Sequence, residues 1–174
     1  GARGEPLASG SAVPADLPRA DACELVIPAE LVLLTRATLP RGSVKKMRQM
    51  LPYAIEDRLV AEPDSVHVAA GGTLADGQTA LAVVDKAWLA RVLARLDAAG
   101  LRPRNAWPET LLPELPADGW VMVWDGHGGF LRSGAQAGLR LDGGSPEQPP
   151  AALALVASQA RASAALPERL LLRL

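Results

Sequence analysis

A proline interrupts the most regular apolar pattern in this chain. Between residues 44 and 59, apolar side chains recur at spacings of three and four, as on one face of a helix: Val44, Met47, Leu51, Ile55 and Leu59. Pro52 lies inside this pattern, has no N–H to donate to the carbonyl of Arg48, and crowds that turn with its ring. The sequence therefore predicts a kink, or two short helices with Pro52 at the start of the second.

An apolar stripe of this kind needs a surface against which it can be buried. The neighbouring segments predict strands at residues 23–27, 31–39, 65–70, 79–85 and 101–106, and a helix at residues 86–99 that ends at Gly100. We expect the stripe of residues 44–59 to pack on a sheet that the strands at 31–39, 65–70 and 79–85 form.

The composition changes at a proline-rich passage, residues 108–116. Beyond it, residues 120–142 are typical of three short strands joined by two glycine turns, and a helix at 151–165 and a strand at 169–174 are expected to follow. The change predicts two adjoining α/β units. Residues 1–21 are rich in Gly, Ala, Ser and Pro and have no periodicity, so they predict a flexible leader.

Composition excludes several classes of protein. A hydrophobic content of 49% indicates a packed chain rather than a disordered one. With 18 basic and 19 acidic residues there is no basic field to attract nucleic acid. The single cysteine, Cys23, excludes an internal disulfide. No apolar run approaches the roughly 20 residues that span a bilayer, and residues 1–21 lack the apolar core of a signal peptide, so we expect the chain itself to be soluble.

The loop from Asp125 to Gly129 is the most suggestive candidate for chemistry. Glycines such as Gly126 and Gly128 let backbone amides approach a phosphate, and Asp125 beside them could hold a metal-bound water. However, Asp-Gly between apolar strands is also a common hairpin turn, which we favour. The Gly-x-x-x-x-Gly-Lys-Ser/Thr motif of a P-loop is absent from the sequence.

Other residues that could carry chemistry have simpler interpretations. His67 and His127 are too few for a multi-histidine metal site, and Cys23 has no evident base to activate it. Glu56 and Asp57 are adjacent in a helix, hence about 100° apart, and would not converge on one atom. We expect them on a solvated or docking face, and we expect no catalytic residue.

The four tryptophans give a less uniform prediction. Trp88 and Trp120 are expected in the core, whereas Trp107 and Trp124 are left open between core and surface.

The order of these segments resembles the cytoplasmic domain of the type II secretion system protein L family. The resemblance rests on VIPAELVLLTRATLP, LPYAIEDRL, VHVA, ALAVVDKAWLARVLARLDAAGLRPRNAWPETLLP and WVMVWDGHGGFLRSGAQAG, and it covers residues 23–174. It implies an α/β (α+β) fold with an actin-like, RNase H-like body. Residues 22–30 would be the edge of this body, residues 31–107 an inserted α+β subdomain, and residues 118–174 the second actin-like subdomain.

The resemblance also gives the glycine loop a third interpretation. Asp125, Gly126 and Gly128 occupy roughly the place of the second phosphate loop of actin-like ATPases, and this family is thought to have lost nucleotide binding. The chain also shows no first phosphate loop of the Asp-x-Gly-Ser/Thr kind ahead of this loop, because the pattern occurs only at residues 142–145, which follow it. The resemblance therefore implies a degenerate loop, no cofactor and no enzymatic activity.

By resemblance, the chain is a scaffold at the cytoplasmic face of the bacterial inner membrane. It would recruit the secretion ATPase, protein E, and couple it to protein M and the pseudopilus, as a homodimer with a single membrane span in the full-length protein. The ATPase would meet the polar face of the 44–59 helix, with Lys45, Arg48, Gln49, Glu56 and Asp57. Two alternatives are kept: the actin-like pilus assembly protein M, and an actin-like nucleotide-binding enzyme.

Overall fold

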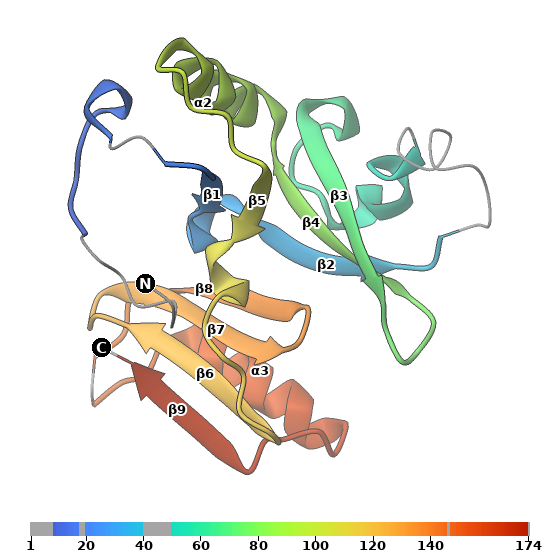
Figure 1. The fold of residues 1–174 in the computed structure, drawn as a ribbon. Helices are drawn as coiled ribbons and strands as arrows, with labels where there is room; N and C mark the ends of the chain where they lie inside the picture. The colour runs from blue at the N-terminus through green and yellow to red at the C-terminus, as the bar shows by residue number, and fades with distance from the viewer. Residues whose placement is uncertain (1–8, 18–19, 40–49, 146, 174) are drawn as a thin grey trace.

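The computed structural model describes residues 9–17, 20–39, 50–145 and 147–173. Strands in these ranges form three separate sheets. Figure 1 shows the two larger sheets one above the other, with a two-stranded pair and a connecting segment between them. The arrangement agrees with the predicted mixture of strands and helices.

The first of the larger sheets is antiparallel and has the order β2-β4-β3. It contains β2 (Leu33–Ala37), β3 (Val66–Thr73) and β4 (Thr79–Asp85). The central strand β4 is rich in buried aliphatic residues, as expected for a strand with neighbours on both sides. The predicted strand at 31–39 starts late because residues Ala29–Leu31 form a 3₁₀ turn, η2.

The stripe that contains Pro52 packs on this sheet as predicted. Leu51 and Ile55 are 1% and 0% exposed and lie in one cluster with Ala37, Leu81 and Val83, against which Leu59 also packs. Residues 44–49 of the stripe lie outside the described residues.

The type of helix after Pro52 differs from the expectation. Pro52 directly precedes η3 (Tyr53–Arg58), a 3₁₀ helix in which Ile55 has a non-helical φ of −130°. A 3₁₀ turn is tighter than an α turn, and the break at Ile55 changes the direction of its side chain, so periodicity based on 3.6 residues fails here. The alternative of a new short helix starting at Pro52 is the one that agrees with the structure.

The helix α2 (Lys86–Ala98) begins without a loop at the end of β4. The carboxylate of Asp85 caps it by accepting a 2.5 Å hydrogen bond from the backbone N–H of Trp88. None of its residues is buried, although the helix packs against β3 and β4. Trp88 is therefore only half-buried, and the prediction that it belongs to the core is wrong.

The sheet β2-β4-β3 and the helix α2 make up the first unit. Two short strands, β1 (Glu24–Ile27) and β5 (Asn105–Pro108), lie before and after this unit in the sequence and pair with each other in parallel. The 3₁₀ turn η5 (Glu109–Leu111) follows β5, and the carboxylate of Glu109 accepts a 3.0 Å hydrogen bond from the N–H of Ala29. The two ends of the first unit are thus fastened to each other. The predicted strand at 101–106 lies a few residues too early.

The second larger sheet has the order β8-β7-β6-β9, in which β9 is parallel to β6 and the other pairs are antiparallel. Its elements are β6 (Gly119–Trp124), β7 (Gly128–Gly134), β8 (Ala137–Asp142), α3 (Ala151–Ala162) and β9 (Arg169–Arg173). The predicted three-strand meander, helix and final strand are all confirmed. One face of α3 covers a core that includes Trp120, Trp124 and Leu131.

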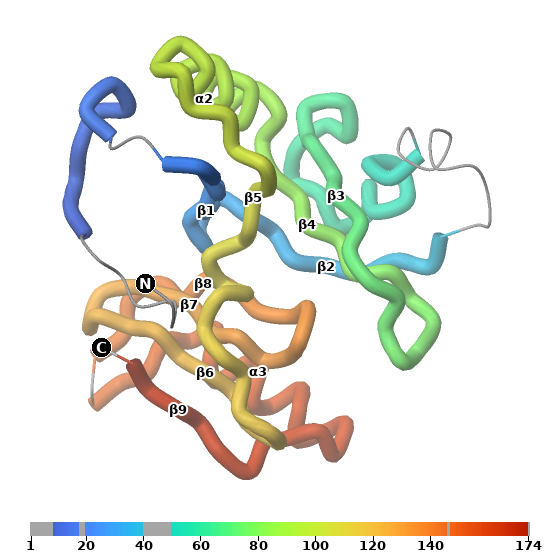
Figure 2. The backbone as a smooth tube through the Cα atoms, viewed as in Figure 1, coloured from blue at the N-terminus to red at the C-terminus, as the bar shows by residue number. Residues whose placement is uncertain are grey.

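The guanidinium of Arg132 holds the connection between the units, which we call the linker (residues 112–118). It donates to the carbonyl oxygens of Leu111 and Pro113 at 2.6 and 2.5 Å, and to those of Gly134 and Ala135 at 3.2 Å each. Removal from water lowers the pKa of Arg132, because burial disfavours its charge. Figure 2 shows the backbone descending from β5 through this segment to β6.

The turn before the linker packs closely on the same sheet. Thr110 is 2% exposed, and a Cβ on Gly138 of β8 would come within 2.3 Å of its methyl group. Only glycine at that position lets η5 approach the strand so closely. The domain boundaries predicted at residues 31, 107 and 118 remain predictions. The strand β5 extends across the boundary at residue 107.

We expect Ile55→Ala to lower the free energy of unfolding by about 2–4 kcal/mol, because it would leave a cavity in a fully packed cluster. Val60→Ala is the matched control: Val60 is fully exposed, so its replacement should change stability by less than about 0.5 kcal/mol. Urea denaturation followed by tryptophan fluorescence measures both. Equal losses in the two variants would contradict this account of the core.

Candidate functional site

The predicted partner surface is only partly within the described residues. Glu56 and Asp57 lie on η3 with exposed side chains, and Asp57 makes one long contact of 3.9 Å to the Nε of Arg58. Lys45, Arg48 and Gln49 fall outside the described residues. The two carboxylates are thus available to a partner, and the structure does not join them to a catalytic arrangement.

Three exposed apolar residues lie near these carboxylates in the sequence, and the sequence analysis did not identify them. Met50 is 44% exposed, Tyr53 55%, and Val60 fully exposed. The hydroxyl of Tyr53 donates a 2.9 Å hydrogen bond to Asp64, and this bond together with the charge of Asp64 raises the pKa of Tyr53. We call Met50, Tyr53, Glu56, Asp57 and Val60 the η3 surface. An apolar centre with a charged rim is the usual composition of a protein interface.

The loop after β6 is a hairpin turn, as favoured from the sequence. Trp124 pairs with Gly129 across the two strands, and residues 125–127 connect β6 to β7. The carboxylate of Asp125 accepts hydrogen bonds of 2.9 Å from the backbone N–H groups of both His127 and Gly128. These amides are the groups that a phosphate would need, and the aspartate already occupies them.

The hairpin is also closely packed. Gly129 has a φ of +154°, and a Cβ there would come within 2.0 Å of the carbonyl oxygen of Val123. His127 accepts a 2.9 Å hydrogen bond at its carbonyl from the N–H of Gly143, and the indole of Trp124 donates to the carbonyl of Gly143 at 3.3 Å. These contacts hold the turn in place against the rest of the second sheet.

The remaining candidates do not form a reactive cluster. Within the described ranges, no three His, Cys, Asp or Glu side chains are placed to hold a metal ion. Trp120 and Trp124 are buried. Trp107 is 48% exposed, and its indole donates a 2.7 Å hydrogen bond to Glu24, which also accepts from Asn105.

None of the helices in the described ranges is long and apolar enough to cross a bilayer.

Comparison with known proteins identifies the family. The sequence model of "Type II secretion system (T2SS), protein L" matches residues 6–170. The chain belongs to this family. Among individual relatives, the protein L of Pseudomonas aeruginosa is 32% identical over 125 residues, which are 72% of this chain and 32% of that protein. The protein L of Vibrio cholerae is 27% identical over 120 residues, 68% of this chain and 29% of that protein.

A solved structure supports the same assignment. It is the cytoplasmic domain of EpsL, an inner membrane component of the type II secretion system of Vibrio cholerae. The TM-score is 0.59 at 25% identity, and the match covers 70% of this chain and 52% of that one. The predicted fold class, α/β of the actin-like kind, is confirmed by this likeness. The chain spans about a third of the length of the relatives in Pseudomonas and Vibrio.

The pairing of Asp125 in the hairpin can be tested by its dependence on pH. Hydrogen bonds from the amides of Gly128 and His127 lower the pKa of Asp125, so its charged form stabilises the fold. We therefore expect wild type to exceed Asp125→Asn in thermal midpoint at neutral pH. The unfolded-state pKa is about 3.9, and the advantage should disappear as the pH falls below this value and through the lower folded-state pKa. A difference that stays constant from pH 7 to the acid limit would contradict this role.

Proposed function

We propose that this chain is a non-catalytic scaffold in the inner-membrane platform of the type II secretion system. Membership of the protein L family, over residues 6–170, is the observation that carries the proposal. The likeness to a domain described as cytoplasmic, from an inner membrane component, supports a position on the cytoplasmic side of that membrane. The membrane span expected from the family resemblance would belong to other parts of the whole protein.

In this role the chain would recruit the secretion ATPase, protein E, and connect it to protein M and the pseudopilus. The full-length protein would act as a homodimer. We further propose that residues 31–107 form the inserted subdomain that meets the ATPase and that residues 118–174 belong to the actin-like body. The fastening of β1 to β5 at the two ends of the first unit supports such an insertion.

The η3 surface is the place where we propose that the ATPase docks. Its apolar members are exposed, whereas the apolar residues on the opposite side of η3 are buried against the sheet. Glu56 and Asp57 would form the polar rim, together with Lys45, Arg48 and Gln49 of the preceding segment. Charges at a rim mainly change the association rate and the salt sensitivity of binding.

We expect the double variant Glu56→Lys and Asp57→Lys to bind the N-terminal domain of the cognate secretion ATPase more weakly than wild type. The loss should be about tenfold in affinity at low salt and smaller at high salt, because salt screens exposed charges. Isothermal titration calorimetry at two ionic strengths measures it. The thermal midpoint should stay close to that of wild type, since both side chains are exposed.

The matched control is Glu114→Lys with Glu147→Lys, which makes the same change of net charge at exposed positions in the linker and in the second unit. It should bind like wild type. Equal weakening in both double variants would mean that net charge, and not this surface, governs the interaction. Wild-type affinity of the Glu56/Asp57 variant at low salt would place the ATPase elsewhere.

An actin-like nucleotide-binding enzyme is the second candidate, because a glycine-containing turn follows the first strand of the second sheet. The bonds from the amides of His127 and Gly128 to Asp125 favour the scaffold instead, since those donors are already used. The pilus assembly protein M is the rival within the same class, and the family match favours protein L over it.

Titration with ATP and Mg²⁺ should accordingly show no saturable binding at millimolar nucleotide. Two matched phosphate loops are needed to clamp a triphosphate and its metal from both sides, and no Asp-x-Gly-Ser/Thr loop precedes the glycine loop in this sequence. Calorimetry with wild type and with Asp125→Ala measures this. Submillimolar binding that Asp125→Ala abolishes would favour the enzyme over the scaffold.

A further inference from the structure

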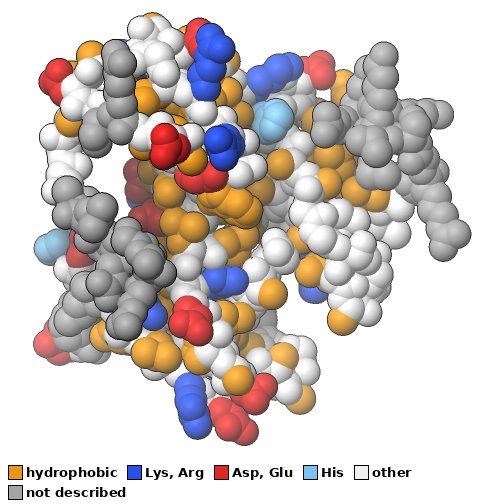
Figure 3. All heavy atoms as spheres, viewed as in Figure 1, with side chains coloured by type: hydrophobic (Ala, Val, Ile, Leu, Met, Phe, Trp, Pro, Cys, Tyr) orange, Lys and Arg blue, Asp and Glu red, His pale blue; other side chains and the backbone are white. Residues whose placement is uncertain are grey.

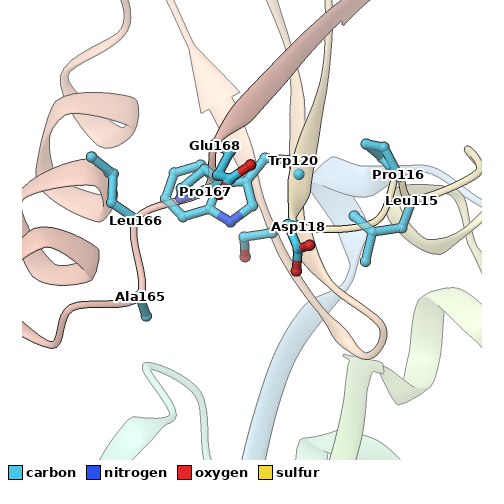
Figure 4. Close-up of a pocket in the computed structure, with 10 residues that line it drawn as sticks. Leu115, Pro116, Asp118, Trp120, Ala165, Leu166, Pro167 and Glu168 are labelled. Carbon is cyan, nitrogen blue, oxygen red and sulfur yellow. The ribbon is translucent and has the colours of Figure 1, made fainter.

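A pocket of about 420 Å³ opens where the parallel strands β6 and β9 begin. The linker forms one wall, with Leu115 and Pro116, and the segment between α3 and β9 forms the other, with Leu166 and Pro167. Figure 4 shows the indole of Trp120 between these two walls. Proline and leucine make both walls apolar, and proline restricts their backbone.

The floor of the pocket has an unused hydrogen-bond donor. Trp120 is 8% exposed, so its side chain is more than nine-tenths buried. The indoles of Trp107 and Trp124 donate to Glu24 and to the carbonyl of Gly143, but the indole N–H of Trp120 has no acceptor among the described residues. The nitrogen itself is open to solvent, because no side-chain nitrogen or oxygen in the described ranges is both buried and unpaired. A ligand in the pocket that offers an acceptor oxygen could therefore take the place of water on this N–H.

The charge of the pocket is entirely negative. Asp118 and Glu168 line it, and no Lys or Arg is among its lining residues. The backbone N–H of Glu168 donates to the carbonyl of Asp118 at 2.9 Å, which holds the two acidic residues side by side on the two walls. The carboxyl end of α3 lies next to this wall, and a helix terminus of that polarity also favours a cation.

We propose that this pocket takes an arginine side chain from an extended segment of a partner protein. The apolar walls would hold the methylene stem, the face of Trp120 would stack on the guanidinium, and Asp118 and Glu168 would pair with its N–H groups. A backbone carbonyl of the same segment would accept from the indole N–H. Phosphate and acidic peptides are repelled by the two carboxylates, and a purely apolar ligand would leave those carboxylates and the indole N–H unpaired.

Figure 3 shows that another face of the molecule has its own apolar area, over β5 and the segment that follows it. That area carries Val26 and Trp107, which are register partners and about half exposed, but nothing in the structure indicates what covers it. The pocket is the stronger candidate because its charges and its unpaired donor define the chemistry of its ligand. The inference does not depend on which partner binds the η3 surface.

The test uses the chain labelled with ¹⁵N at its tryptophan indoles. The four indole N–H signals are observed by NMR, after each has been assigned to its own tryptophan. N-acetyl-arginine amide supplies the guanidinium, the stem and a carbonyl, and N-acetyl-norleucine amide supplies the stem and carbonyl without charge. We expect the Trp120 indole signal to move saturably with the arginine compound and to move little with the norleucine compound. The signals of Trp88, Trp107 and Trp124 should stay in place.

The double variant Asp118→Asn and Glu168→Gln should weaken binding of the arginine compound about tenfold. Asp118 has a φ of 54°, a conformation that asparagine also tolerates, so the variant should fold. Asp142→Asn with Glu147→Gln is the control for net charge and should bind like wild type. No saturable movement of the Trp120 signal, equal binding of the two amides, or wild-type binding by the folded Asp118/Glu168 variant would each overturn the proposal.

Discussion

The guanidinium of Arg132 determines how the two units of this chain are joined. Four backbone carbonyls surround it, two from the start of the linker and its preceding turn and two from the β7–β8 turn. A half-buried cation without a carboxylate partner among the described residues is costly, and its rigid fork of donors compensates by satisfying several carbonyls at once. A lysine could not make this set of bonds from one position. The linker therefore has one defined path across the second sheet.

The rest of the junction follows from that path. Because the linker is fixed, the preceding turn lies where Thr110 fits against Gly138. Glu109 in the same turn then reaches the N–H of Ala29, and β5 is placed beside β1. The first unit is thus held to the second through these bonds, and β2 and η2 also contact β8 directly. The η3 surface is not part of this junction, and its apolar members are exposed.

Local signals in the sequence predicted much of this fold. Glycine turns between apolar runs gave the three-strand meander, and spacings of three and four correctly identified Leu51 and Ile55 as core residues. The errors have specific causes. Pro52 introduced a 3₁₀ helix whose period differs from 3.6, and Trp88 lies on a helix that is too weakly covered to be buried. Periodicity reveals which face of a helix is apolar but not how completely a neighbour covers it.

The candidate sites were less predictable because they are assembled from distant residues. The turn at Asp125 could be recognised, since its sequence is local. The pocket could not: about 50 residues separate Asp118 from Glu168, and only the parallel pairing of β6 with β9 brings them together. The prolines that form its walls gave a weak signal, because Pro116 and Pro167 each lie just before a strand. The exposure of Met50 and Tyr53 was not predicted, because only their charged neighbours were considered as surface residues.

The parallel pairing of β1 with β5 also determines how the chain would respond to mechanical force. Tension between the N-terminal segment and the second unit pulls on the beginning of β1 and on the end of β5, which lie at opposite ends of the pair. Parallel strands loaded in this way are sheared, so their hydrogen bonds bear the load together instead of opening one after another. The 77 residues between Ile27 and Asn105 lie outside this path. A pull along the chain would thus bypass the first unit for as long as the short pair holds.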